Sequence, residues 1–263
     1  MFATDTPGHE LMRSVSAASL RDPSPIVQQF PDVSAKYHMQ PLKTTSIDYA
    51  RPSPVDALTA RLLACSEDNI TFFTRGNRVY FKNLNNGVNE EATQLYKLSE
   101  SRGCLRAIEC GGKSLPGVVA VGTSQGFVQT WDIQTRKLIL AWPTSKDISA
   151  LAWNGPVLTV GSVKGTVRLY DTRISPVEKM REQSRKNTRH QSHITSLSWN
   201  ANGKLLASGD ATGMIHCWEA GQTPMMPLNV GEFVQRRKKI QHEGGISVRD
   251  PLHFLLCIIE TRD

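Results

Sequence analysis

The chain has 263 residues, 39% of them hydrophobic, which is enough for a sizeable core and argues against a wholly disordered protein. No apolar run reaches the roughly 18 residues of a membrane span, and the N-terminus lacks the charged-then-apolar layout of a secretory signal, so we expect neither membrane insertion nor secretion. The five cysteines are scattered, which favours buried thiols in a reducing compartment. The formal net charge is +7, so a nucleic-acid partner has to be considered.

The positive charge is concentrated in two short stretches, 181–189 and 236–239, which we place in loops between repeat units. The second stretch is wholly basic, and the basic residues of the first are Arg181, Arg185, Lys186 and Arg189. No aromatic side chain interleaves them, although proteins that bind unpaired bases usually stack them on aromatic rings. A solvated loop or a surface for an acidic partner is therefore favoured, and we predict no nucleic-acid partner.

Residues 1–54 are rich in Ser, Thr and Pro and lack sustained periodicity, so we predict a disordered or extended N-terminal arm. The arm contains the pairs Thr6-Pro7, Ser24-Pro25 and Ser53-Pro54. Such pairs can accept phosphate from proline-directed kinases, and they are also ordinary turn and linker chemistry. Both interpretations stay open for each pair.

An imperfect repeat unit covers residues 57–83. Its apolar segments are Leu62–Cys65, Ile70–Phe73 and Val79–Phe81. The dipeptide Gly76-Asn77 supplies good hairpin chemistry between the second and third segments. For residues 85–101 we predict a polar connector, with a short helical turn around 90–98.

A longer phrase then occurs three times. It consists of two glycines separated by three residues, an alternating strand, and a closing aromatic residue followed by an acid. The copies are Gly122–Asp132, Gly161–Asp171 and Gly209–Glu219. An apolar run precedes each copy, and the similar phrases Ile148–Asn154 and Ile194–Asn200 lie upstream of the last two. Because glycine tolerates positive φ without a steric cost, the paired glycines predict a tight turn between two strands.

The units recur every 40 to 50 residues, roughly the period of a propeller blade. Strands with apolar residues on both faces must be covered by neighbouring units, so several blades must stack. We therefore predict an all-β fold, a WD-repeat β-propeller that is incomplete, with about four blades. In this interpretation residues 1–54 are the disordered N-terminal arm, 55–248 the propeller blades and 249–263 an aberrant tail outside the repeats.

Four stretches carry a resemblance to a known family. They are Asn69–Phe81, Ala120–Asp132, Leu151–Arg173 and Phe233–Gly245. They resemble the first three blades, and the lead-in to the next blade, of the fizzy family, the WD-repeat activators of the anaphase-promoting complex (APC). The resemblance covers about 55–248.

The sequence also departs from that family. Residues 1–54 lack the family's complex-docking box, an acidic residue followed by Arg, an aromatic, Ile and Pro, and the chain does not end in the family's Ile-Arg tail. After Val248 the expected strand is replaced by Arg249–Pro251 and His253–Glu260, which continue no blade. We interpret the sequence as a truncated member, and we expect its open sheet edges to make it poorly stable by itself.

The resemblance implies a non-catalytic activator and substrate adaptor of the APC ubiquitin ligase, without a cofactor, in the nucleus and cytoplasm. Its implied partners are APC subunits and substrate proteins that carry degron peptides, with no membrane partner. In the family an acidic residue just before the first blade helps to hold the basic degron, and Asp56 lies nearest that position. A solvated linker residue is the alternative for Asp56. A general WD-repeat scaffold of another complex is the alternative function.

A catalytic interpretation rests on one motif, because Gly122-Thr-Ser124-Gln-Gly126 formally matches the nucleophile elbow of hydrolases. That elbow requires a strand-to-helix turn, whereas an alternating strand follows here. The equivalent positions in the other copies are Val163 and Ala211, which cannot act as nucleophiles. We therefore predict a structural turn and no enzyme activity.

Metal binding is also not indicated, because an apparent strand separates Cys104 from Cys110, and His190 with His193 has no cysteine pair at zinc spacing. We assign His190 the structural role of the Gly-His pair of WD repeats. The acid that pairs with such a histidine is expected in the turn, at Gln125, Lys164 or Thr212, where none stands. The sequence thus predicts blades held mainly by apolar packing and strand hydrogen bonds.

Overall fold

The computed structural model describes residues 61–86, 91–144, 146–221 and 240–241. All of them belong to one compact unit, Asp48–Asp263. The predicted arm over 1–54, the tail over 249–263 and the basic stretch 236–239 lie outside the described residues. No helix in the described part of the chain is long and apolar enough to cross a membrane.

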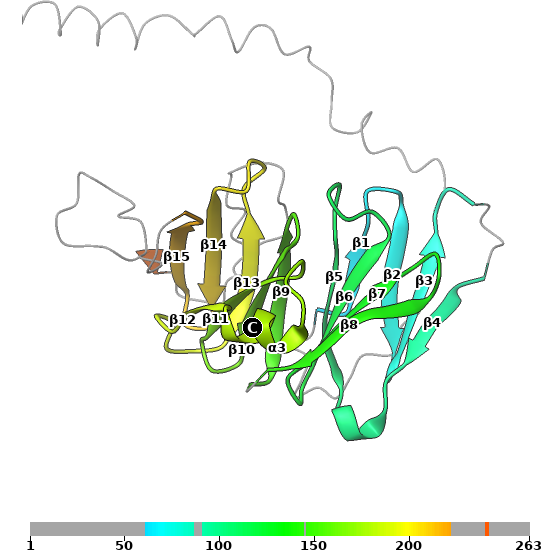
Figure 1. Cartoon of the computed structure of the whole chain (residues 1–263), viewed down its shortest axis with the longest axis horizontal. Coiled ribbons are helices and arrows are strands. Elements are labelled where there is room, and N and C mark those ends of the chain that lie inside the picture. The colour runs from blue at the N-terminus through cyan, green and yellow to red at the C-terminus, as the bar shows by residue number, and fades with distance from the viewer. Residues whose placement is uncertain (1–60, 87–90, 145, 222–239, 242–263) are drawn as a thin grey trace, which may run out of the picture. The chain divides into compact units, whose positions relative to one another are not determined.

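The described residues form four antiparallel sheets of four strands each, which we call blades 1 to 4 in chain order (Figure 1). Blade 1 contains β1 (Leu63–Cys65), β2 (Ile70–Arg75), β3 (Arg78–Asn83) and β4 (Thr93–Lys97). Blade 2 contains β5 (Leu105–Cys110), β6 (Val118–Thr123), β7 (Phe127–Asp132) and β8 (Lys137–Pro143). Blade 3 contains β9 (Ile148–Asn154), β10 (Val157–Ser162), β11 (Val167–Asp171) and β12 (Arg185–Asn187). Blade 4 contains β13 (Ile194–Trp199), β14 (Leu205–Asp210), β15 (Met214–Glu219) and β16 (Ile240–Gln241).

The predicted all-β class is confirmed, and the repeated phrases form the middle of each blade. In blades 2, 3 and 4 the two-glycine phrase begins at the end of the second strand, makes the tight turn and continues as the third strand. The Gly76-Asn77 hairpin is also present, between β2 and β3, and Gly76 has φ = 59°. Local sequence therefore determines these turns.

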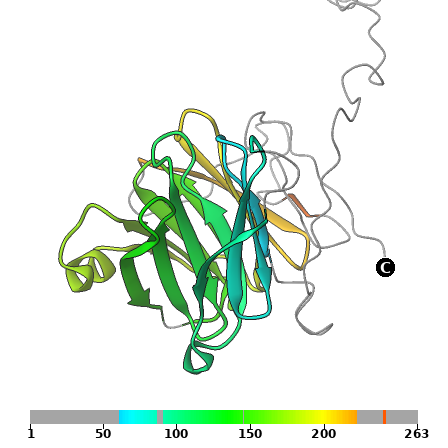
Figure 2. The ribbon, with the colours of Figure 1, turned by 90° about the vertical axis from the view of Figure 1, so that its right-hand side faces the viewer.

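Two local predictions are wrong. The described residues of the segment 90–98 form the strand β4 and contain no helical turn. A single 3-10 turn follows at Glu100–Arg102. Tyr96 pairs with Val79 of β3, and Leu95 and Tyr96 are buried, so pairing with the sheet outweighs local preference. The stretch 181–189 is not simply a loop either, because it contains the end of α3 (Val177–Glu182) and all of β12. Figure 2 shows α3 projecting from the side of the sheets.

The hydrophobic core lies between the blades. The first strands of successive blades, β1, β5, β9 and β13, lie beside one another in that order. Tyr96 of blade 1 stacks on Trp131 of blade 2 with ring centroids 4.4 Å apart, and Trp142 of blade 2 lies 5.4 Å from Tyr170 of blade 3. Between blades 3 and 4, Trp199 donates a hydrogen bond to Thr159 Oγ1 at 2.9 Å. Each blade therefore buries its faces against its neighbours, as expected for stacked repeats.

Candidate functional site

The residue that the sequence indicates for degron binding, Asp56, lies outside the described residues. The described part of the chain offers three other features that bear on function. They are the turn around Ser124, the polar network of His190, and the cavities between the blades.

The turn around Ser124 connects β6 to β7, so a strand and not a helix follows the serine. The hydroxyl of Ser124 accepts a hydrogen bond from the backbone N–H of Cys104 at 2.9 Å, which fixes the loop that leads into β5. A nucleophile elbow needs the opposite arrangement, an exposed hydroxyl at the start of a helix. The predicted structural turn is confirmed.

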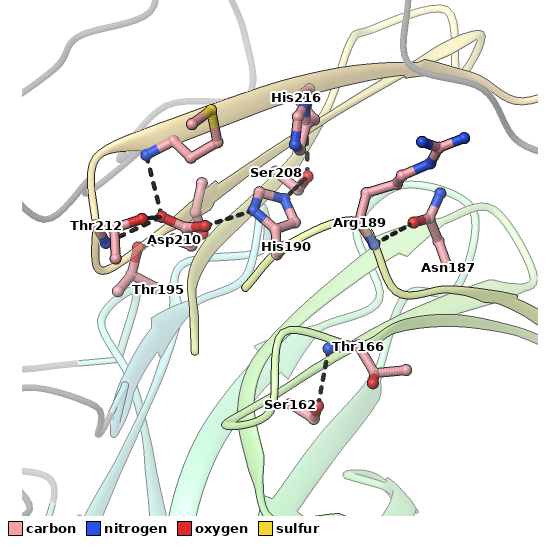
Figure 3. A network of polar contacts seen from close by, with 12 residues as sticks. Ser162, Thr166, Asn187, Arg189, His190, Thr195, Ser208, Asp210, Thr212 and His216 are labelled. Atoms are coloured by element: carbon pink, nitrogen blue, oxygen red, sulfur yellow. Dashed lines mark hydrogen bonds and ion pairs between the residues drawn. The ribbon is translucent and has the colours of Figure 1, made fainter. Parts of the chain in front are cut away.

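His190 is the centre of a buried polar network in blade 4 (Figure 3). Its Nδ1 lies 2.8 Å from Asp210 Oδ2, and its Nε2 lies 2.7 Å from Ser208 Oγ. Trp218 donates its indole N–H to the same Ser208 oxygen at 2.8 Å. The network joins the loop before β13 to β14 and β15. Its members come from three separate segments, so it fastens the two middle strands of the blade to its entrance loop, the loop that precedes β13.

The expectation that no acid pairs with this histidine is wrong. The acid is Asp210, the last residue of β14, rather than a residue of the following turn. In the other blades the same position is Thr123 or Ser162, and all three side chains accept the N–H of the residue four positions later, at 3.0 to 3.1 Å. The position is thus a turn acceptor in blades 2 to 4, and in blade 4 an aspartate there also reaches the histidine.

Asp210, His190 and Ser208 have the connectivity of a hydrolytic triad, but not its accessibility. The side chains of His190 and Asp210 are each only 1% exposed, and Ser208 is also buried, so no substrate can reach the hydroxyl. Ser208 Oγ is further engaged by Trp218. A triad needs a nucleophile at a surface with donors for the developing oxyanion. The arrangement is therefore structural.

The protonation states agree with this role. Burial lowers the pKa of His190, against the opposing effect of Asp210, so the imidazole is neutral near pH 7. Burial by itself raises the pKa of Asp210, but hydrogen bonds from Thr212, His190 and the Met214 N–H more than offset this and hold the pKa below its ordinary value. The neutral imidazole then donates a hydrogen bond from Nδ1 to the carboxylate and accepts one from the Ser208 hydroxyl at Nε2.

A cavity of about 330 Å³ lies between blades 2 and 3. It is lined by Pro143, Thr144, Arg168, Tyr170, Glu178, Arg181 and Glu182. Two guanidinium groups and two carboxylates thus surround a buried aromatic ring, and burial raises the pKa of Tyr170, so its hydroxyl stays protonated. Such a mixture of an apolar floor and a charged rim suits a short peptide better than a small apolar ligand.

A second cavity, of about 220 Å³, lies between blades 1 and 2 and is lined in part by Glu67, Asp68, Cys110 and Lys113. Burial raises the pKa of the Cys110 thiol, which makes it a poor nucleophile. Nearby in sequence, burial raises the pKa of Glu109 to about 7, against the opposing effect of Arg61. Among the described residues no group of three or more His, Cys, Asp or Glu side chains could hold a metal ion.

Comparison with known proteins gives these features a context. Residues 182–219 match the model of the WD domain, G-beta repeat. "Cell division cycle 20.1, cofactor of APC complex" of Arabidopsis thaliana is 26% identical over 213 residues, covering 80% of this chain and 42% of that protein. "Protein FIZZY-RELATED 2" of the same plant is 29% identical over 226 residues, 84% of this chain and 43% of its own length. The resemblance to the fizzy family is thereby confirmed, and the chain spans less than half the length of these curated relatives.

Solved structures show the same architecture. A chain in the crystal structure of the mitotic checkpoint complex superimposes with a TM-score of 0.61 at 20% identity, over 78% of this chain and 63% of that chain. The computationally designed Ika8 protein superimposes with a TM-score of 0.51 at 19% identity, over 70% of this chain and 51% of its own. At these identities the likeness concerns the fold alone, and it supports the WD-repeat propeller architecture.

Proposed function

We propose that this chain, a WD-repeat relative of the Cdc20 and Fizzy-related cofactors of the APC complex, is itself an APC cofactor. The observation that carries the proposal is the similarity to "Cell division cycle 20.1, cofactor of APC complex" at 26% identity over 80% of this chain, together with that to "Protein FIZZY-RELATED 2" at 29% over 84%. We further propose that it acts as a substrate adaptor, which captures degron peptides on its blades and presents them to the ligase. The nucleus and cytoplasm are the compartments in which that role would be carried out.

The proposed role is non-catalytic. The constellation with triad connectivity that the described residues contain, around His190, is buried, and Ser124 is a turn residue whose hydroxyl accepts a backbone N–H. An adaptor needs only a surface that binds an extended peptide, and the edges and clefts of stacked sheets supply such surfaces. Two places are candidates for the peptide, namely the segment around Asp56 and the cavity between blades 2 and 3.

The test uses a fluorescent degron peptide with one essential basic residue. Fluorescence anisotropy measures the affinity of this peptide for the purified full chain. If Asp56 holds that residue, Asp56→Asn should weaken binding by about tenfold, the effect of losing one charge-assisted contact. Asp48→Asn, which removes the same charge eight positions earlier, is the matched control and should leave the affinity unchanged.

The cavity is tested with the same peptide. Arg181→Glu reverses a charge that lines the cavity, whereas Lys179→Glu makes the same charge reversal at an exposed residue of α3 that does not line it. Loss of binding in the first variant only would place the peptide between blades 2 and 3.

Retention of purified APC subunits on the tagged chain tests the cofactor role separately. If the chain retains no APC subunit and binds no degron peptide, the adaptor proposal is wrong, and a general WD-repeat scaffold becomes the better interpretation.

A further inference from the structure

The two ends of the blades differ in charge. In a sheet of four sequential antiparallel strands, the second-to-third turn and the connection to the next blade lie at the same end. We call this the cationic end, because its loops and strand ends carry Arg75, Arg78, Arg102, Lys146, Lys164 and Lys186. Among the described residues of this end, the acids are Glu100, Asp147 and the buried Asp210, and Asp147 is paired with Arg106 at 3.7 Å.

The opposite end is mixed in charge. Acids occupy its loops at Glu67, Asp68, Asp132 and Asp171. Two of its cations are paired with these acids, since Lys113 lies 3.9 Å from Glu67 and Arg173 lies 2.6 Å from Asp171. The excess positive charge of the described blades is therefore concentrated at one end.

Hydrogen bonds hold the loops of the cationic end together. Asn77 of the β2–β3 turn donates to the carbonyl of Gly103, and Ser124 of the β6–β7 turn accepts the N–H of Cys104. Farther along, the N–H of Val163 in the β10–β11 turn donates to the carbonyl of Asp147 at 3.0 Å. The loops of blades 1, 2 and 3 are thus connected to one another, so the backbone positions that carry these cations are fixed relative to one another.

Three lysines from different segments converge where blades 2 and 3 meet. Lys146 lies in the β8–β9 loop, Lys164 in the β10–β11 turn and Lys186 on β12. The backbone N–H of Val163, next to Lys164, donates to the carbonyl of Asp147, next to Lys146, and Val167 pairs with Asn187, next to Lys186. The three lysines therefore lie on neighbouring stretches of backbone. The charge of Lys164 is the largest cause that lowers the pKa of Lys146, and the charge of Lys186 acts in the same direction. Like charges repel, and a surface that keeps them together attracts anions.

We propose that the cationic end of blades 1 to 3 binds an extended Asp- and Glu-rich segment of a partner protein. Its charges are spread along a row of loops, which matches several carboxylates along a chain. A single phosphate is better held by a compact cluster of arginines. Unpaired bases require exposed aromatic rings, yet Phe127 is covered by the Arg102 guanidinium 4.4 Å from its centroid. No large exposed hydrophobic side chain among the described residues is aromatic.

The proposal is tested with the purified full chain and a fluorescein-labelled peptide of alternating Glu and Gly, which contains no degron. The combined substitution Lys146→Gln, Lys164→Gln and Lys186→Gln should weaken binding by about tenfold, because surface charge pairs are individually weak and act together. The matched control is Lys113→Gln, Lys137→Gln and Lys204→Gln, which removes the same charge from the opposite end. It should leave the affinity within about twofold of the natural chain, since only distant and screened charges are lost.

Circular dichroism of both variants is the check that they remain folded. Equal weakening in the two variants would overturn the proposal, because the peptide would then respond only to net charge. The proposal would also be overturned if a singly phosphorylated, otherwise neutral peptide bound more tightly than the Glu-Gly peptide. Tighter binding of a single-stranded oligonucleotide with the same charge as the Glu-Gly peptide would overturn it as well. The degron peptide measured in parallel separates this inference from the proposed function, because its binding should not change in the Lys146, Lys164 and Lys186 variant.

Discussion

Asp210 shows how one side chain can serve two structural purposes. Its Oδ1 accepts the N–H groups of Thr212 and Met214 and so closes the β14–β15 turn, while its Oδ2 pairs with His190. The sequence pattern places the acid in the turn, two residues later, because it registers the turn and not the pairing across the sheet. Only the packed blade brings the entrance loop, with His190, over the end of β14.

The network gives a prediction at this scale. His190→Ala should lower the free energy of unfolding by about 3 kcal/mol, because it leaves a buried carboxylate and the Ser208 hydroxyl without their partner. Urea denaturation of the purified chain measures the change. Asp68→Asn, at an exposed aspartate, is the control and should not shift the midpoint. A midpoint unaffected by His190→Ala would show that the network contributes no stability.

At the scale of elements, the first glycine of the repeated phrase is required for packing between blades at Gly122 and Gly161. A Cβ built on Gly122 would lie 2.5 Å from Ile148 Cγ2, and one on Gly161 would lie 2.8 Å from Ile194 Cγ2. Both isoleucines begin the first strand of the following blade. The glycine is therefore needed for close approach of the two sheets, whereas the second glycine of the phrase has positive φ, as at Gly126 with 75°.

Overpacking this contact should be destabilising. Gly122→Ala is expected to lower the free energy of unfolding by about 1–3 kcal/mol, because the methyl group would overlap the Ile148 side chain. Gly221→Ala is the control, since no atom lies within 4 Å of the added Cβ. In a double-mutant cycle, Ile148→Ala should cost less in the Gly122→Ala background than in the natural chain. Strictly additive effects in thermal or urea denaturation would refute the contact.

At the scale of the whole molecule, stability should vary along the described blades. Blades 2 and 3 are packed on both faces by described blades, whereas β1 of blade 1 exposes 57% of Leu63. Stacked repeats are stabilised through contacts with their neighbours, so a blade packed on both faces opens less often.

Hydrogen exchange followed by mass spectrometry can measure this gradient. Peptides from β9 and β10 should exchange at least about tenfold more slowly than peptides from β1 and β2, which corresponds to a difference of roughly 1.4 kcal/mol in opening free energy. Uniform protection across the four blades would instead indicate a single cooperative unit and would contradict the prediction.

The sequence by itself determined the all-β class, the blade period and the strand–turn–strand unit, because alternating apolar residues and paired glycines act within a few residues of one another. It also indicated the resemblance to the fizzy family. Only the tertiary structure decided that the segment before the 3-10 turn is β4 and that Asp210 pairs with His190. It likewise brought the backbone segments that carry Lys146, Lys164 and Lys186 to one boundary between blades. These features join residues from different strands or blades, and local patterns carry no information about which distant segments pack together.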